Sequence, residues 1–460
     1  MSGKVLNNLL LIFVSAVSLF FAFQLLSFHV FYQPYFVDEI LDIESSFNFL
    51  KYGHYTFSFF REDNKYFAPG CSVGIVSGWP SALGWAIGGS MVYARFMSIA
   101  YCFLLFAVLC WLFVKYHLSS KFSFYVLFTS IAWLATFRIV PYAVDGVVMT
   151  LGEFSGAMVL GIGLVLMKPR PIWGSFFLGL CVWHTKFIYL PFAMLGVFCL
   201  GYDFNESFSK NIKQLTKYFL WFLLPLFVWL VIIWLRTGLT GLVSWLSIRL
   251  GFIKYGGSGL DGTPHVTGLF NRLNTLEWKD YNPGRKVRVL FLLGGASALL
   301  VLNVLYRFRR KLTDRNKDVF ETGLFLLIIL FTVWYFFWHR FMFIRHLEPA
   351  LLACWAIMAM IFAKLLDKLT GMRRYVFSLA CAAMLISGIV TKTPKELIFL
   401  GAQLPKEQFS RKCSIPNSWD WGPRDVFVCD RTLFLECIDQ RDNKCGESVL
   451  AEKLPLFNFK

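Results

Sequence analysis

The sequence predicts an all-α polytopic membrane protein of about eleven transmembrane helices, followed by a small soluble tail. Three observations support this fold class: the composition, the length of the apolar segments and the position of the basic residues between them. Of the 460 residues, 57% are hydrophobic and 18% are aromatic, and 51 are phenylalanine. A soluble domain of this size is less apolar, whereas helical membrane proteins have this composition.

The first apolar segment, residues 9–31, is long enough to cross a hydrocarbon core of roughly 30 Å at about 1.5 Å per helical residue. It has no small-residue cleavage site, so we interpret it as a retained helix rather than a signal peptide. Residues 32–91 are predicted to form an interfacial loop, in which residues 40–70 mix aromatic and charged side chains. Residues 71–90 are rich in glycine and broken by Pro80, which indicates that they continue this loop or dip into the bilayer. Further crossings are predicted at 92–114, 122–141, 146–167, 218–236, 287–306, 319–338, 347–364 and 375–392.

Residues 172–201 fit either one long helix or two short helices that break near residues 183–186. A single helix would place the basic runs at 210–217 and 307–317 outside the membrane. A break places both runs inside, together with the basic residues at 115–121, 168–170 and 364–374. Because Lys and Arg favour the cytoplasmic side, their distribution predicts the broken pair. Half-helices too short to span are tolerated where the break lines a protein-walled or watery cavity.

The formal net charge of +17 comes from basic residues in short runs between apolar segments. The positive-inside rule explains most of this charge, so we expect the lipid bilayer as partner and no nucleic acid. The resulting topology is multi-pass in the inner (cytoplasmic) membrane, with the N-terminus in the cytoplasm. The outer, periplasmic face then holds residues 38–39, 141–145, 184–186, 237–286, 339–346 and the tail.

The transmembrane domain is predicted to span residues 1–392, with an outer loop at 237–286 and a tail at 393–460. The outer loop is rich in glycine and opens with an amphipathic stretch, residues 242–253, which favours equally a mobile lid and a plain linker. The tail contains Cys413, Cys429, Cys437 and Cys445, which predicts two disulfides in an oxidising compartment. A zinc site is the alternative, although the tail has no Cys-x-x-Cys pair and no histidine. The other cysteines mostly lie in apolar segments, where we expect small core residues.

Charged residues at membrane depth are costly, by roughly 2.5–3.5 kcal/mol for a central charge, so they usually have a partner or a task. In the predicted topology such residues gather on the outer face: Asp38, Glu39, Arg95, Arg138, Asp145, Glu153, His184, Lys186, His339, Arg340, Arg345 and His346. Each has a structural interpretation, as a solvated acidic turn, an arginine that snorkels to the surface or, for Glu153, a helix-packing hydrogen bond. The convergence of acids and bases on one face favours a functional site.

Short motifs follow one another in a fixed order along residues 1–365: VDEI at 37–40, YFAPG at 66–70, ARF at 94–96, LGE at 151–153, TK at 185–186 and IRHLEPA at 344–350. In this order the chain resembles the GT-C class of integral-membrane glycosyltransferases. This class includes the protein O-mannosyltransferases and the bacterial aminoarabinose and lipopolysaccharide-modifying sugar transferases. The resemblance implies a GT-C-like fold for the transmembrane domain.

The resemblance also implies an inverting enzyme that moves a sugar from a polyprenyl phosphate to a hydroxyl of a cell-envelope acceptor, which is a glycan, lipid or protein. Asp38 matches the position of the base that accepts the hydroxyl proton, with Glu39 beside it. The phosphate needs fixed positive charge, because negative charge develops on it in the transition state. The phosphate-binding candidates are Arg345, Lys186, His184, His346 and Arg138, and the substrate-binding candidates are Asp145, Glu153 and Arg95.

No cofactor is expected, and a divalent metal is not supported. Some relatives with pyrophosphate donors use a metal, but a monophosphate needs none if Arg and Lys neutralise it. The competing interpretation is a transporter or flippase of a lipid-linked or anionic sugar, which would also place charges at a broken helix pair. We find no internal repeat, and the acids lie at the outer rim except Glu153, so glycosyl transfer is the favoured interpretation.

Overall fold

The computed structural model describes residues 74–88, 91–117, 153–203, 206–254 and 315–337, and a few positions (45–46, 49–50, 53, 55, 350, 353, 357 and 376) outside these ranges. The elements are α3 (Ile75–Gly88), α4 (Met91–His117), α7 (Glu153–Leu166), α8 (Pro171–His184), the 3-10 turn η1 (Phe187–Tyr189), α9 (Leu190–Gly201), α10 (Phe208–Lys254) and α14 (Arg315–Phe337). The prediction of an all-helical protein is confirmed for these residues. The predicted crossings at 9–31, 122–141 and 287–306 lie outside the described residues, as do nearly all of those at 347–364 and 375–392.

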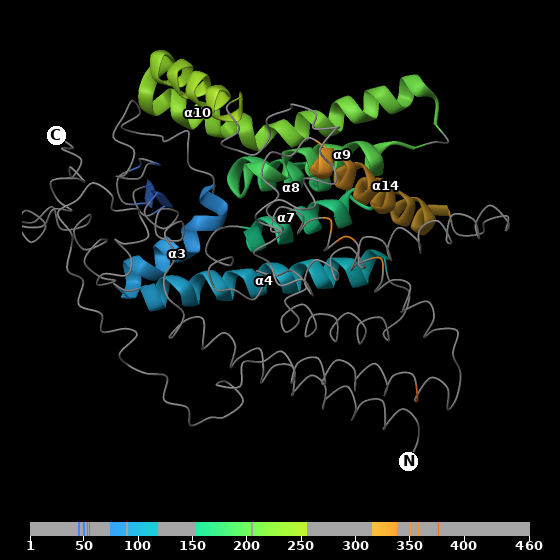
Figure 1. Ribbon diagram of the computed structural model, residues 1–460, viewed down its shortest axis with the longest axis horizontal. Coiled ribbons are helices and arrows are strands. Elements are labelled where there is room, and N and C mark those ends of the chain that lie inside the picture. The colour runs from blue at the N-terminus through green and yellow to red at the C-terminus, as the bar shows by residue number, and fades with distance from the viewer. Residues whose placement is uncertain are drawn as a thin grey trace, which may run out of the picture.

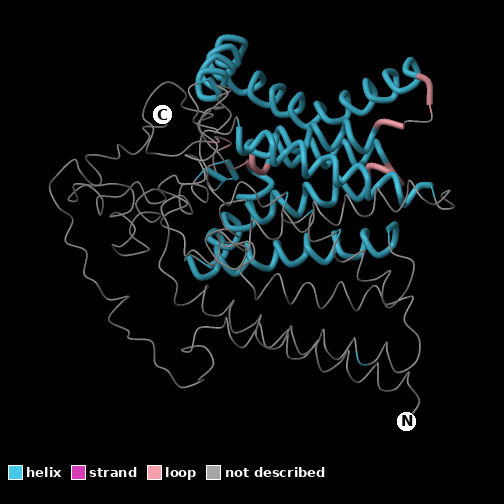
Figure 2. Tube along the Cα trace, turned by 45° about the vertical axis from the view of Figure 1, so that its right-hand side comes forward, coloured by secondary structure: helices cyan, strands magenta, loops and turns pink. Residues whose placement is uncertain are grey.

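The described helices form a stack of layers. In Figure 1, α4 lies below α7, and the pair α8 and α9 lies above α7. α10 lies above this pair and packs mainly on α8. Figure 2, turned by 45°, shows the same order of layers. α14 packs on α9, where the rings of Phe192 and Phe331 meet edge to face at 4.8 Å between centroids. The apolar interior therefore lies between α4, α7, α8, α9 and α14.

Glycines set how closely these layers approach. A Cβ atom at Gly179 of α8 would collide with the carbonyl oxygen of Phe222 in α10, so the two backbones pack closely here. A Cβ atom at Gly163 of α7 would lie 2.9 Å from the amide nitrogen of Leu178 in α8. Small residues let membrane helices approach closely enough for van der Waals packing, which drives their association in lipid.

Among the residues that the structure describes, two helices are long and apolar enough to cross a membrane, namely Tyr93–His117 and Phe208–Ser247. α10 exposes large apolar side chains along its length, among them Leu220, Phe227 and Leu235. On α4, Phe96, Leu104 and Trp111 are exposed in the same way. Contiguous apolar surface of this kind is unusual on a soluble monomer and suits contact with lipid.

One end of the stack collects basic residues, and we call it the basic end. His117, at the end of α4, has Nε2 2.9 Å from the carbonyl oxygen of Val165 at the end of α7. Its ring also stacks on Phe320 near the start of α14, at 3.7 Å between centroids. The ends of α4 and α7 and the start of α14 therefore meet here. The basic residues of these ends and of the neighbouring turns are Lys115, Lys168, Arg170, Lys210, Lys213, Arg315 and Lys317.

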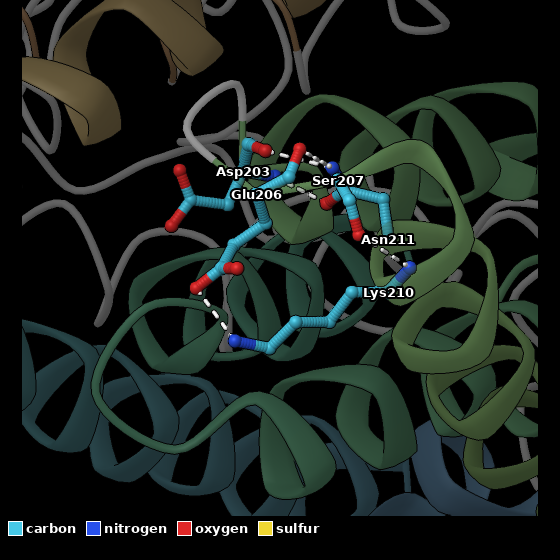
Figure 3. Close-up of polar contacts among 5 residues, drawn as sticks. All are labelled: Asp203, Glu206, Ser207, Lys210 and Asn211. Atoms are coloured by element: carbon cyan, nitrogen blue, oxygen red, sulfur yellow. Dashed lines mark hydrogen bonds and ion pairs between the residues drawn. The ribbon is translucent and has the colours of Figure 1, made fainter.

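The turn from α9 into α10 is built from polar contacts at the basic end (Figure 3). Buried Asn211 donates from Nδ2 to the carbonyl oxygens of Asp203 (2.7 Å) and Glu206 (3.2 Å), while its Oδ1 accepts from the Asp203 amide. Ser207 caps α10 by accepting from the Lys210 amide at 3.4 Å, and Lys210 pairs with Glu206 at 2.8 Å. Burial lowers the pKa of the nearby Lys168 ammonium, and the Asp203 carboxylate opposes this shift. These contacts fix the polar turn that separates the two apolar helices.

The structure overturns the expectation that Pro80 breaks residues 71–90, because α3 is continuous from Ile75 to Gly88 with Pro80 inside it. A proline there removes one backbone hydrogen bond and costs about 3 kcal/mol in an isolated helix. Pro80 is buried together with Ala82 and Trp85, and α3 packs tightly on α4. Tertiary burial therefore offsets the local penalty.

α10 changes direction at Gly238, where φ is +72° and ψ is −178°. Glycine adopts this conformation without the steric penalty that other residues meet. After the turn, Leu242, Trp245 and Leu246 pack with Trp229 and Ile233, so the helix doubles back along itself (Figure 1). We call residues 239–254 the return arm. The amphipathic stretch at 242–253 thus lies in a helix packed on α10, and residues 255–286 of the outer loop lie outside the described part.

Candidate functional site

The centre of the candidate site is the break between α8 and α9. α8 ends at His184, and the amides of both Thr185 and Lys186 donate to the carbonyl oxygen of Cys181, at 3.1 and 3.0 Å. Lys186 then has an extended backbone (φ −139°, ψ 110°), and Pro191 at the start of α9 has no amide hydrogen to continue a helix through this point. The predicted broken pair is confirmed. Because Gly196 of α9 lies against Leu178 of α8, the chain reverses direction at the break.

The reversal places the break at the end of the stack opposite the basic end, and we call this the break end. α7 begins there, since its Gly156 faces the Thr185 hydroxyl, with 3.0 Å from the position of an added Cβ. α3 also begins there, because the amide of Gly74 donates to the carbonyl oxygen of Thr185 at 2.7 Å. A buried contact of 2.6 Å between the hydroxyls of Ser77 and Ser155 joins α3 to α7. The starts of α3 and α7 therefore lie beside the break.

Lys186 is buried at the break, with 8% of its surface exposed, and Phe187, Ile188 and Tyr189 after it are buried too. A lysine that is removed from water in this way needs polar or anionic surroundings, because desolvation penalises its charged form. Because its backbone is extended, Lys186 belongs to neither α8 nor α9, unlike a lysine on a helix surface. It is held inside the protein at the break.

His184 attaches the break to α10. Its Nε2 lies 2.9 Å from the carbonyl oxygen of Pro225, and its ring meets Trp229 edge to face at 5.4 Å. A carbonyl oxygen only accepts, so Nε2 carries the hydrogen in this contact. His184 thus has a structural role, and its contact with a phosphate stays a prediction. With Nε2 engaged, any contact between His184 and a phosphate would use Nδ1.

Arg95 is fully buried on α4, with 0% of its surface exposed, so it does not snorkel to the protein surface. It continues the buried face of α4, which is apolar further on at Cys102 and Phe106. Ser98 on the same face is also fully buried. On the antiparallel α3, the buried hydroxyl of Ser81 has no hydrogen-bond partner. The interface of α3 and α4 is therefore polar toward the break end and apolar toward the basic end.

Antiparallel packing of α3 and α4 sets the level of Ser81 along this interface. Trp79 meets Tyr101 at 5.6 Å between ring centroids, whereas Gly84 lies against the backbone of Tyr93. Ser81 falls between these two contacts, at the level of Arg95 and Ser98. Two helices thus contribute polar groups to one buried layer.

Glu153 is the first residue of α7, two residues before the Ser155 hydroxyl that contacts α3. Its backbone position puts an acidic residue at the break end.

Four predicted site residues fall within the described part of the chain: Arg95, Glu153, His184 and Lys186. His184 and Lys186 lie at the break, Glu153 begins α7 beside it, and Arg95 lies on α4 in the half of that helix farther from the basic end. The other predicted site residues lie outside the described part: Asp38, Glu39, Arg138, Asp145, Arg345 and His346.

Arg249, which lies on the return arm, is not among the residues predicted from the sequence. Its guanidinium carbon is 4.7 Å from the centre of the Phe187 ring, next to Lys186 in the chain. The aromatic group of Tyr55 and Trp229, whose rings meet edge to face at 5.6 Å, is also not predicted. Gly238, followed by an amphipathic stretch, is a sequence signal for a turn between two helices. That signal does not show on which surface the second helix packs.

The structure describes four cysteines. Cys102, Cys110, Cys181 and Cys199 are buried free thiols, as expected for core residues. The remaining cysteines, including the four in the tail, lie outside the described residues. Within the ranges that the structure describes, no three His, Cys, Asp or Glu side chains come together to hold a metal ion.

No protein-family model matches this chain, and no curated protein or solved structure matches it.

Proposed function

We propose that this protein is an integral-membrane glycosyltransferase of the GT-C class. It transfers a sugar from a polyprenyl phosphate to a hydroxyl of a cell-envelope acceptor. The observation that supports this most is the break in the α8–α9 pair, which holds buried Lys186 at the same end as Arg95 and Glu153. The basic runs at the opposite end, with exposed apolar helices between the two ends, support a site on the outer side of a membrane.

In this reaction the acceptor oxygen attacks the anomeric carbon of the sugar, while the bond from that carbon to the phosphate oxygen breaks. Asp38 accepts the hydroxyl proton, and Glu39 orients the acceptor or its neighbour. Lys186 and Arg345 stabilise the negative charge on the leaving polyprenyl phosphate. Attack from the face opposite the phosphate inverts the anomeric configuration. His184, His346 and Arg138 support the phosphate, and Asp145, Glu153 and Arg95 bind the substrates.

The proposed membrane placement follows from the two ends of the stack. Lys115, Lys168, Lys210 and Arg315 at the basic end face the cytoplasm, as the positive-inside rule requires. The break end and the tail then lie on the outer side of the inner membrane. α4 and α10 cross the bilayer with their exposed apolar side chains in lipid.

The test is a reconstituted assay with protein in liposomes, a polyprenyl-phosphate sugar labelled in the sugar, and cell-envelope acceptors. We expect the label to appear on the acceptor and free polyprenyl phosphate to accumulate, without any ion gradient. A panel of donors and acceptors covers the identity of the sugar. If neither labelled acceptor nor free polyprenyl phosphate forms with any donor and acceptor of the panel, the proposal is contradicted.

A transporter or flippase is the second candidate, because broken helices also form the substrate sites of transporters. The same liposomes separate the two functions. A flippase would move intact labelled lipid between leaflets and leave the bond between sugar and phosphate whole.

A further inference from the structure

One face of α10 runs from the break to the end of the helix body. Pro225, Trp229 and Arg236 share this face, because helical positions four or eleven residues apart point in nearly the same direction. Pro225 and Trp229 both contact His184 at the break. The step from Trp229 to Arg236 is about 10 Å at 1.5 Å per helical residue. Arg236 therefore stands at the rim of the break end.

Gly53 lies against the guanidinium of Arg236. A Cβ atom at Gly53 would be 3.1 Å from Nη2, 3.2 Å from Cζ and 3.4 Å from Nη1 of this arginine. Because the three distances are nearly equal, the glycine faces the flat side of the guanidinium and not its edge. Gly53 has a φ of +74°, a conformation that favours glycine. Its amide donates to the Phe49 carbonyl oxygen at 2.9 Å, and the rings of Phe49 and Tyr55 pack on Trp229, so this backbone is held against α10.

The edge of the Arg236 guanidinium is available to a ligand. The side chain is exposed, and within the described part of the chain no hydrogen bond or ion pair occupies it. Lys210 near the start of α10 differs, because its ammonium pairs with Glu206 at 2.8 Å. Trp234 and Leu235, directly before Arg236, are exposed apolar side chains that suit contact with lipid. Arg236 thus combines an unpaired fork of N–H donors with a place beside apolar surface.

We infer that Arg236 binds the phosphate of a membrane lipid at the break end, and that Gly53 holds its guanidinium for this contact. A planar guanidinium donates to two phosphate oxygens at once, so the same fork fits a phospholipid and a polyprenyl phosphate. An arginine that only reaches toward water needs no backbone platform under its flat side. The inference uses the proposed placement in a membrane and does not depend on sugar transfer.

The test measures lipid binding by calorimetry, with purified full-length protein in an uncharged detergent. The three probes are a short-chain polyprenyl phosphate, a short-chain phosphatidylglycerol and the polyprenol that lacks the phosphate. The variants are Arg236→Gln, Arg236→Lys and Gly53→Ala, each checked for folding by size-exclusion chromatography and thermal unfolding. Lys210→Ala is the matched control, because it also removes one positive charge from α10, but a charge that already pairs with Glu206.

We expect Arg236→Gln to weaken binding of one phosphate lipid, or of both, by about 10- to 100-fold, the range for a charge-assisted contact. The lipid that is affected identifies the source of the phosphate. Arg236→Lys should lose less, because it keeps the charge without the planar fork. Gly53→Ala should also weaken binding, because its methyl group would displace the guanidinium. Polyprenol binding by every variant, and all binding by Lys210→Ala, should match wild type.

Equal binding of both phosphate lipids by wild type and folded Arg236→Gln would overturn the inference and leave the proposed function intact. If Arg236→Gln does not fold, unchanged binding by Arg236→Lys and Gly53→Ala would overturn it, since both alter the fork. An equal loss of polyprenol and phosphate-lipid binding would also overturn it, because Arg236 would then only hold the backbone at Gly53 in place. Weaker binding of phosphate lipid alone by Arg236→Gln, with no sugar transfer by wild type, would support the inference and contradict the proposed reaction.

Discussion

Asp38 is the residue to which the proposed reaction assigns proton transfer. Asp38→Asn has nearly the same shape but cannot accept the proton, so we expect turnover to fall by about 10²- to 10⁴-fold. Expression and binding of the donor should remain normal, because the substitution leaves the phosphate contacts in place. The measurement is the initial rate of sugar transfer by purified protein at saturating donor.

Glu39→Gln is the control for this prediction. If Glu39 orients the acceptor or its neighbour, its substitution should reduce turnover less than Asp38→Asn does. Turnover near wild type in Asp38→Asn would rule out Asp38 as the base.

Lys186 and Arg345 are expected to hold the phosphate from separate segments of the chain. A charge-assisted contact contributes roughly 1.5–3 kcal/mol, so Lys186→Ala or Arg345→Ala should weaken use of the donor by about one to two orders of magnitude. Arg345→Lys should restore only part of this loss, since a point charge lacks the planar fork of Arg. Steady-state kinetics with varied donor will measure the effect. Unchanged kcat/KM for the donor in both alanine variants would argue against this phosphate site.

Helix packing can be tested at Gly179, where α8 meets α10. A methyl group at this position would collide with the carbonyl oxygen of Phe222, which is backbone and cannot rotate away. Gly179→Ala should therefore destabilise the protein by about 1–3 kcal/mol, the usual range for overpacking. Thermal unfolding in detergent, followed by loss of the monodisperse peak in size-exclusion chromatography, provides the measurement.

Gly161→Ala is the matched control on α7. There an added Cβ would lie 2.9 Å from Cδ2 of Leu109, a side-chain atom that can move. Alanine also has a helix propensity about 1 kcal/mol better than glycine, so the control should be nearly neutral. Equal unfolding temperatures for both variants would contradict the close approach of α8 and α10.

The break between α8 and α9 is the element on which the predicted topology depends. In the sequence, the distribution of the Lys and Arg runs predicts this break, and α8 indeed ends at His184. The structure adds the local cause: two amides share the Cys181 carbonyl, and Pro191 prevents the helix from continuing. These are contacts within a few residues, so the chain itself contains the information for the break.

The orientation of the whole molecule can be tested with single cysteines or reporter fusions. We expect positions within 205–215 and within 307–317 to report the cytoplasm, because both lie in basic runs and the positive-inside rule governs them. Labelling with a membrane-impermeant thiol reagent, before and after permeabilisation, gives the measurement. A control cysteine in the tail, in a variant without the native tail cysteines, should be labelled from the outside. Opposite sides for 205–215 and 307–317 would contradict the topology.

The tail supplies a second test of orientation. Cys413, Cys429, Cys437 and Cys445 should form two disulfides if the tail faces an oxidising compartment. Non-reducing mass spectrometry after alkylation should find no free thiol among them, and it will also decide among the three possible pairings. Four reduced thiols in native membranes would place the tail in the cytoplasm or make it a metal site.

The sequence by itself determined the helical class of the described part, the approximate extents of α4 and α14, the break near Trp183 and the core role of four cysteines. Each of these follows from composition, hydropathy or charge along the chain, which are local properties. Tertiary structure decided that Pro80 lies inside a helix and that α10 doubles back at Gly238. It also decided that Arg249 reaches Phe187 and that Arg95 is buried at the break end. These contacts join residues far apart in the chain, and their free energy comes from packing between helices, which no local pattern specifies.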